Sequence, residues 1–369
     1  MDKASKLMLS LPKELDAVLI TSPENRLYFT GFSGDGVLLL TRNPFYFFAA
    51  SQSYGAAGKS IRDMILLPLE EGLSALPEIC EKYSVQRIAV EAESLPVARL
   101  KRLRGRYPQV EFLVDDRVDA LIAKLRKRKT DYELDCIRAA QKITEAAFTK
   151  TLRSLKPTET ERQLAAKLEY ELRLLSGERN FVSVSRTNGG SSAGNGKKSS
   201  AGDMFKGDVI TFHLETSVKG YSCHMVRTLS VGNPPEELRL ACDALLSVWS
   251  VLLKTIRPGT FCGQIEKDCR ELLEQRGYSP TFLRIVGHGI GAARREPPFF
   301  APDSREELES GMVFFLSMAL FVPGFGRVEI GDTLQVTETG CASLCTYPKG
   351  LVPETGSGVP NAASKNQED

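Results

Sequence analysis

The chain has 369 residues, 42% hydrophobic and 25% charged, a composition typical of a globular protein that buries a sizeable core. Its 48 basic and 46 acidic residues leave a formal net charge of +2, which argues against nucleic acid or an anionic membrane as a partner. The start of the chain lacks the apolar core of a signal peptide, and no apolar run approaches the roughly 20 residues of a membrane span. Eight cysteines without a CxxC pair favour reduced thiols, so we expect a cytoplasmic protein.

Strand and helix signals alternate over the first third of the chain. Four short apolar runs predict buried strands, at residues 17–20, 36–41, 45–50 and 87–90. Helical periodicity predicts helices at residues 71–83 and 97–107. This alternation indicates an α/β domain over residues 1–124. The basic run 124–129 that follows is interpreted as a solvated linker face rather than as a binding patch.

A second domain is expected over residues 125–352, because a capping box, Thr130 to Glu133, opens a new pair of long helices. Further helices are predicted at residues 236–253 and 263–276, and strands at 282–286, 312–316 and 332–337. The Gly/Ser-rich segment 188–202 is interpreted as a flexible surface loop, with a lid as the alternative. Residues 353–369 are small and polar, which indicates a disordered tail.

A predicted hairpin over residues 207–232 carries two of the three histidines in the chain. Its apolar, β-branched runs are joined across residues 217–220, which include a glycine. With the turn centred on Val218-Lys219, His213 and His224 face each other across the strands. Cross-strand partners have Cβ atoms roughly 5 Å apart, close enough for two imidazoles to share one metal ion.

Several short motifs resemble those of the Xaa-Pro aminopeptidase, prolidase and creatinase family, an M24-type metallopeptidase family. The amino-terminal motif is YFTGFSG, at residues 28–34. The later motifs follow in order and spacing: Gly-Asp, Gly-Tyr and Arg-Thr of the hairpin, GHGIG at 287–291, EPP at 296–298, GMV at 311–313 and VTETG at 336–340. The resemblance covers roughly residues 14–350. It implies an α/β creatinase-like amino-terminal domain, an α+β pita-bread carboxy-terminal domain, and a homodimer.

The ligand positions that the resemblance implies have changed. Active peptidases of this family bind two divalent ions through two Asp, one His and two Glu side chains. Those positions here are His213, His224, His288, Ser317 and Gly331, so His288 alone is retained. Two neighbouring ions need several negative ligands, which three neutral imidazoles do not supply. We therefore expect a rebuilt three-histidine site for one divalent transition metal, zinc, iron, copper or nickel, acting on a small C–N-bonded substrate or a short peptide.

Four charged residues complete the candidate site. The two-residue period of a strand puts Glu215 on the face of His213, and Glu329 on the face of Gly331. Each is a candidate fourth ligand or general base, with a solvated strand edge as the alternative. Arg295 replaces a catalytic histidine of the family beside Glu296, where it either binds a substrate carboxylate or forms an ion pair with Glu296.

Two other functions remain open. A catalytically inactive family member that binds a ligand or a protein is the main alternative, because five catalytic groups of the family are lost. Metal-free catalysis on an amidine or guanidine compound, as in the creatinase branch, ranks last, because the proton-shuttling histidine expected near Asn195-Gly196 is missing.

Overall fold

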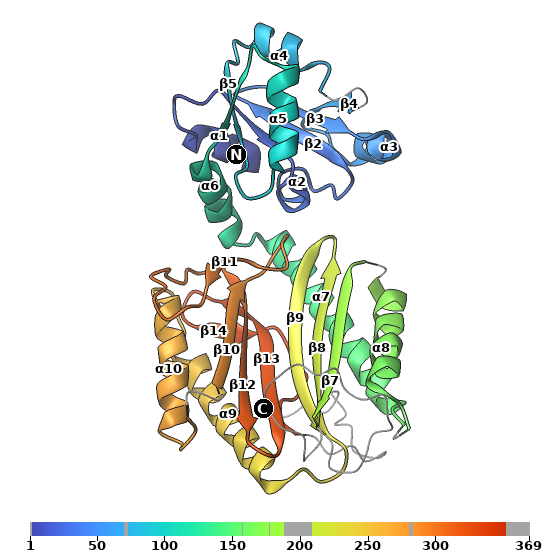
Figure 1. Cartoon of the computed structure of the whole chain (residues 1–369), viewed down its shortest axis with the longest axis vertical. Helices are drawn as coiled ribbons and strands as arrows, with labels where there is room; N and C mark the ends of the chain where they lie inside the picture. Colours follow the sequence, from blue (N-terminus) through green and yellow to red (C-terminus); the bar gives the residue numbers. More distant parts are fainter. Residues whose placement is uncertain are drawn as a thin grey trace, which may run out of the picture. The chain divides into compact units, whose positions relative to one another are not determined.

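The computed structural model describes residues 2–69, 73–156, 158–176, 178–187, 209–279 and 283–351. The chain divides into two compact units, Met1–Arg126 and Lys127–Asp369 (Figure 1). The sequence places a boundary between residues 124 and 125. The Gly/Ser-rich segment 188–202 and the tail 353–369 lie outside the described residues.

The first unit is an α/β domain around a six-stranded sheet with the strand order β4-β3-β2-β1-β5-β6. The strands are β1 (Ala17–Ile20), β2 (Gly36–Thr41), β3 (Phe45–Ala49), β4 (Ile65–Pro68), β5 (Arg87–Val90) and β6 (Glu111–Val114). The helices are α1 (Lys3–Ser10), α2 (Pro23–Thr30), α3 (Ser51–Ser60), α4 (Leu76–Lys82), α5 (Val97–Arg106) and α6 (Asp116–Lys127). Alternate residues of β1 enter two different apolar clusters, Val18 and Ile20 in one and Ala17 and Leu19 in the other. Both faces of the sheet are therefore buried at β1, whose four residues are all apolar.

The second unit contains a larger sheet with the strand order β11-β10-β12-β13-β9-β8-β7, and β14 pairs with β13. Its strands are β7 (Asn180–Thr187), β8 (Val209–Val218), β9 (Tyr221–Ser230), β10 (Leu283–Gly289), β11 (Glu296–Phe299), β12 (Val313–Val322), β13 (Gly326–Val336) and β14 (Cys341–Ser343). Its helices are α7 (Asp131–Arg153), α8 (Glu161–Ser176), α9 (Glu236–Thr255) and α10 (Cys262–Glu274). The predicted capping box is confirmed, since Thr130 and Glu133 exchange both capping hydrogen bonds at the start of α7.

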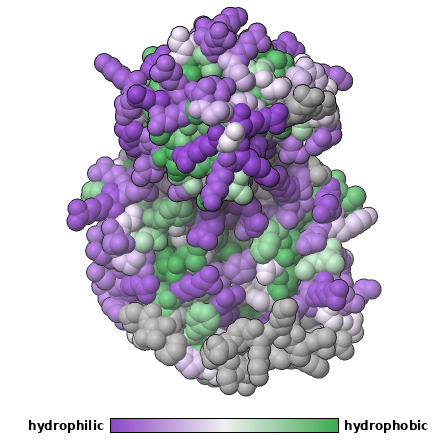
Figure 2. Space-filling model, turned by 45° about the horizontal axis from the view of Figure 1, so that its top comes forward, coloured by the Kyte–Doolittle hydropathy of each residue, from purple (hydrophilic) through white to green (hydrophobic). Residues whose placement is uncertain are grey.

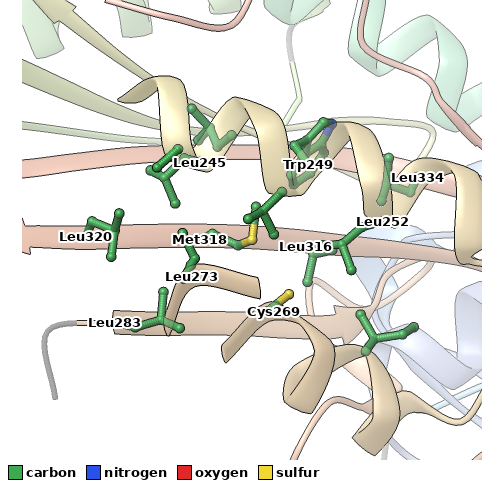
Figure 3. Packing of buried hydrophobic residues seen from close by; sticks show 14 of the residues in the cluster. Leu245, Trp249, Leu252, Cys269, Leu273, Leu283, Leu316, Met318, Leu320 and Leu334 are labelled. Carbon is green, nitrogen blue, oxygen red and sulfur yellow. The ribbon is translucent and has the colours of Figure 1, made fainter. Parts of the chain in front are cut away.

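One face of the larger sheet carries most of its apolar core. Leu316, Met318 and Leu320 of β12 pack against Leu245, Trp249 and Leu252 of α9 (Figure 3). Leu214 of β8 belongs to the cluster formed with α7 and α8. Leu316 and Leu214 lie on the same face, because the pairings Leu316–Asp332, Asp332–Met225 and Met225–Leu214 run straight across four strands. Residues one position further along these strands therefore point to the opposite face.

The basic run before α7 is exposed at Lys124 and Arg128, but Lys127 and Lys129 are paired with carboxylates, so the interpretation as a solvated face is wrong for these two residues. Lys127 forms an ion pair with Glu306. The Lys129 ammonium lies 2.7 Å from Glu296 Oε1, and both side chains are buried. Gly311 accepts a backbone hydrogen bond from Lys129 at 2.8 Å. These contacts tie residues 127–129 to the β10–β12 side of the larger sheet.

Figure 2 shows one face of the molecule, on which hydrophilic residues predominate and hydrophobic residues appear in separate groups. None of the helices in the described ranges combines the length and the apolar composition that a membrane span requires.

Candidate functional site

The three histidines and the lost ligand positions lie in two neighbouring rows across the face of the larger sheet opposite its main apolar core. The first row runs His288, Phe315, Thr333, His224 and Glu215, from β10 to β8. The second row runs Ser317, Gly331, Val226 and His213, from β12 to β8. The strand period therefore brings all three histidines to one face of the sheet.

The hairpin register differs from the predicted one by two residues. The turn centres on Lys219-Gly220, whose φ angles are +49° and +79°, rather than on Val218-Lys219. Positive φ at both central positions is the requirement of a type I′ turn, and glycine meets it at the second position. As a result His213 faces Val226, and Glu215 is the direct partner of His224. The expected His213–His224 cross-strand pair is therefore wrong, although both histidines share a face.

His224 and His288 come together at the centre of the first row. Their ring centroids are 5.3 Å apart, and Phe315 packs on both rings with centroid distances of 5.2 and 5.6 Å. His288 Nδ1 lies 3.0 Å from the carbonyl oxygen of Gly289. Because a carbonyl only accepts, Nδ1 carries the proton and Nε2 keeps its lone pair. His224 Nε2 is buried without a hydrogen-bond partner.

Both of these imidazoles are held neutral at pH 7. Burial lowers the pKa of His224 well below its usual value of 6.5, and the neighbouring His288 and Arg294 lower it further. Burial likewise lowers the pKa of His288, against the opposing effect of its bond to Gly289. Neutral imidazole is the form that binds metal ions.

His213 belongs to a separate cluster. Its Nε2 lies 3.4 Å from Glu329 Oε2 and 3.4 Å from a guanidinium nitrogen of Arg327. The Ser317 hydroxyl donates to the other Glu329 oxygen at 3.3 Å. Burial raises the pKa of Glu329, but His213, Arg327 and Arg284 together outweigh burial, so the net shift of the pKa is downward and the carboxylate is ionised. In the conformation observed, His213 is engaged by Glu329 and Arg327.

Glu215 contacts both His224 and Arg294, and the sequence analysis did not single out Arg294. Its Oε2 lies 3.6 Å from His224 Nε2, accepts a hydrogen bond from Arg294 Nε and forms an ion pair with Arg294 Nη2. The Arg294 guanidinium stacks over the ring of Phe181 at 4.9 Å. Burial raises the pKa of Glu215. Arg294 lowers it, but the net shift of the pKa is upward.

Glu296 is a buried partner of Lys129, and Arg295 is exposed. The ion pair considered between Arg295 and Glu296 is therefore corrected, because the cation that neutralises Glu296 is Lys129. Gly291 permits this arrangement, since a Cβ at this position would lie 2.7 Å from Glu296 Oε1. The guanidinium of Arg295 is exposed, so it is accessible for its other expected role, which is to bind a substrate carboxylate.

A two-ion centre does not fit these residues. Ser317 and Gly331 supply no carboxylate, and they are direct cross-strand partners. A Cβ on Gly331 would lie 2.6 Å from Ser317 Cβ and 3.0 Å from two ring atoms of Phe315. Side chains thus fill the space beside Gly331. Over the described ranges, no three or more His, Cys, Asp or Glu side chains converge as a metal site.

The sequence reasoning missed Phe315, Arg294 and Phe181. The two-residue period from Ser317 would have placed Phe315 on the same face. Arg294 and Phe181 had no comparable signal in the sequence. Arg294 lies in the loop between β10 and β11, and Phe181 lies on β7, a strand that was not predicted.

Comparison with known proteins agrees with the fold and the motifs. The family model "Metallopeptidase family M24" matches residues 135–338, and the model "Creatinase/Prolidase N-terminal domain" matches residues 3–128. A Xaa-Pro dipeptidase of Lactobacillus delbrueckii is 28% identical over 339 residues, covering 88% of this chain and 91% of that protein. A Xaa-Pro dipeptidase of Pyrococcus furiosus is 25% identical over 341 residues, covering 92% and 95%.

Solved structures show the same architecture over almost the whole chain. A Xaa-Pro dipeptidase from Bacillus anthracis superimposes with a TM-score of 0.85 at 25% identity, covering 95% of this chain and 99% of that chain. An X-Pro aminopeptidase from Thermotoga maritima, at 24% identity and a TM-score of 0.83 with the same coverage, has the same fold. The chain therefore belongs to metallopeptidase family M24, with a creatinase/prolidase-type amino-terminal domain followed by a pita-bread domain.

Proposed function

We propose that this chain is a rebuilt family hydrolase in which one divalent transition metal ion replaces the two-ion centre. His224 and His288 hold the ion, His213 completes a three-histidine set, and zinc, iron, copper or nickel suit such ligands. The substrate is a small C–N-bonded molecule, for which the Xaa-Pro dipeptidase relatives suggest a short peptide. The observation that carries this proposal is the pair of neutral imidazoles with His224 Nε2 unpartnered.

The hydrogen bonding of the histidine pair supports metal binding. A metal-ligating histidine commonly donates its other ring N–H to a carbonyl, which is the bond that His288 makes to Gly289. His213 joins the set only if its imidazole leaves Glu329. When bound, such an ion would supply Lewis acidity for a substrate carbonyl.

The chain's own charged groups would handle the substrate. Glu215 and Glu329 are ionisable groups beside the histidines, and each is suited to accept a proton from a water molecule. The exposed Arg295 is suited to bind a substrate carboxylate in bidentate fashion.

Metal stoichiometry and turnover test this function together. Purified protein is incubated with zinc, iron or copper, desalted and analysed for bound metal, and then assayed with a panel of Xaa-Pro and other dipeptides. We expect one ion per chain, loss of that ion in His224→Ala and His288→Ala, and metal-dependent hydrolysis. Absence of bound metal after incubation with zinc, with iron and with copper would refute the proposal.

A second candidate is an inactive family member that binds a ligand or a protein. The filled space around Gly331, Ser317 and Phe315 favours this function, because it leaves no room for the carboxylate ligands of a two-ion centre. Tight binding of a dipeptide without metal and without hydrolysis would support this second function over the first.

We also propose a homodimer in a reducing, cytoplasmic setting. All eight cysteines are free thiols, which supports the reducing compartment. Light scattering of the purified protein measures the oligomeric state directly, and a monomer at micromolar concentration would refute the dimer.

A further inference from the structure

The two halves of the larger sheet meet where β9 runs beside β13. Ten residue pairs join β12 to β13 and ten join β8 to β9, and all four strands are fully described. Between β9 and β13 the ladder consists of two pairs, Gly331–Val226 and Asp332–Met225. We call this junction, residues 224–228 of β9 and 329–333 of β13, the seam. Buried backbone groups beyond the two pairs need other hydrogen-bond partners.

At one end of the seam a threonine hydroxyl takes the place of a backbone partner. Thr333 Oγ1 accepts a hydrogen bond from the backbone N–H of His224 at 2.8 Å and donates to the carbonyl oxygen of His224 at 2.9 Å. The carbonyl of Thr333 itself accepts from the backbone N–H of Leu344, just after β14, at 2.9 Å. Because His224 is 4% exposed, loss of this hydroxyl would leave its backbone N–H and C=O buried without partners.

The other end of the seam has the same arrangement with the two strands exchanged. Thr228 Oγ1 of β9 accepts from the backbone N–H of Glu329 at 2.9 Å and donates to the carbonyl oxygen of Glu329 at 2.8 Å. Glu329 is 3% exposed, so its backbone also depends on a threonine hydroxyl. Its carboxylate is the group that engages His213.

A buried ion pair holds the seam between the two threonines. Arg227 of β9 donates to the carbonyl oxygen of Gly331 at 2.9 Å, and its guanidinium lies 2.8 Å from Asp332 Oδ1. Both charged side chains are buried. These contacts keep β9 against β13 independently of the threonines. Loss of one hydroxyl is therefore expected to move the backbone at one end of the seam without separating the strands.

We propose that Thr333 and Thr228 are positioning residues of the candidate site, which fix the backbones of His224 and Glu329 where the strand ladder ends. Thr333 thereby keeps the His224 ring against His288, at a centroid distance of 5.3 Å. Each role requires a hydroxyl that both donates and accepts, which serine shares with threonine and valine lacks. The inference requires no metal ion and holds for either function proposed above.

Imidazole signals in a long-range proton–nitrogen correlation spectrum of full-length, metal-free protein test the role of Thr333. Thr333→Val keeps the branched shape without the hydroxyl, so it is expected to shift the ring signals of His224. It is also expected to weaken the nuclear Overhauser contact between the rings of His224 and His288, and to leave the His213 signals in place. Thr333→Ser keeps the hydroxyl and is expected to retain the His224 signals of the unmodified chain.

Thr228→Val tests the other end of the seam and is expected to give the reverse pattern. It should shift the ring signals of His213, whose Nε2 lies 3.4 Å from Glu329 Oε2, and leave those of His224 in place. The matched control is Thr216→Val on β8. Within the described ranges Thr216 Oγ1 is buried without a hydrogen-bond partner, so its removal should change no imidazole signal.

Two results would overturn the positioning roles. Unchanged His224 signals in Thr333→Val would show that His224 is held without the hydroxyl, and displaced His224 signals in Thr333→Ser would show that the hydroxyl is not what holds it. Equal shifts of all three histidines in both valine variants would show that the hydroxyls stabilise the sheet as a whole. The single-metal function fails separately, by absence of a bound ion, because these spectra are recorded without metal. Fluorescence of Trp249, the single tryptophan, checks that each variant is folded.

Discussion

Gly331→Ala is the change whose effect the structure defines most sharply. Gly331 lies on β13 directly opposite Ser317, and its φ is outside the left-handed region, so alanine is compatible with the backbone itself. The added Cβ would lie 2.6 Å from Ser317 Cβ and 3.0 Å from the Phe315 ring. The first of these atoms is fixed to the backbone of β12, so the strands must shift.

Overpacking of this kind costs typically about 1–3 kcal/mol. Replacing glycine by alanine also stabilises the folded state by about 0.4–1 kcal/mol, because it reduces the conformational entropy of the unfolded chain. We therefore expect Gly331→Ala to lower the free energy of unfolding by up to about 2.6 kcal/mol, with a central value of about 1.3 kcal/mol. Ser317→Gly removes the closest contact, so the double variant should lose less than the sum of the two single variants.

Urea unfolding followed by tryptophan fluorescence is the assay, because the only tryptophan, Trp249, is buried in the core of the larger unit. Gly340→Ala in the same unit is the matched control, since the nearest atom to its Cβ would be 4.0 Å away. Equal stability of Gly331→Ala and Gly340→Ala, or strict additivity with Ser317→Gly, would refute the claim that side chains fill this part of the site.

Two further predictions concern buried charges. Because the pKa values of His224 and His288 are lowered in the fold, the unfolded chain binds more protons below pH 6.5. Their contribution to stability is complete above about pH 6.5 and is lost as the pH falls toward the folded pKa values, by up to about 1.4 kcal/mol per pH unit for each group. Urea midpoints at several pH values measure this slope, which His224→Gln should reduce; a slope that His224→Gln leaves intact would argue against a buried neutral His224. Lys129→Met leaves the Glu296 carboxylate buried without its cation and should cost about 3–5 kcal/mol, of which Lys129→Met combined with Glu296→Gln recovers most. A single Lys129→Met variant as stable as the unmodified chain would contradict this pairing.

The sequence predicts which residues of the central hairpin share a face of the sheet. It does not predict which residues of the two strands are paired with each other. Alternation of apolar residues is unchanged when the turn centre moves by one residue, because the register then moves by two. Both registers put His213 and His224 on one face. The choice between them depends on the turn, where glycine at position 220 adopts a positive φ and selects Lys219-Gly220.

The missed elements have similar physical reasons. The strands β4 and β6 are short, and β11 contains two prolines, which weakens any strand signal. The helix α3 contains two glycines and carries a single buried residue, Ala57, so its apolar periodicity is weak. Contacts such as Arg294 with Glu215 join residues 79 positions apart, and no local pattern records them.

The protonation state of three imidazoles tests the central claim most directly. The chain has three histidines, so a long-range proton–nitrogen correlation spectrum contains three imidazole signals, assigned with His213→Gln, His224→Gln and His288→Gln. At pH 7 we expect His224 and His288 to be neutral, with His288 protonated on Nδ1, and both to shift when one equivalent of zinc is added. Spectra that stay unchanged in excess zinc, or that show either residue as a charged imidazolium at pH 7, would contradict the metal site proposed here.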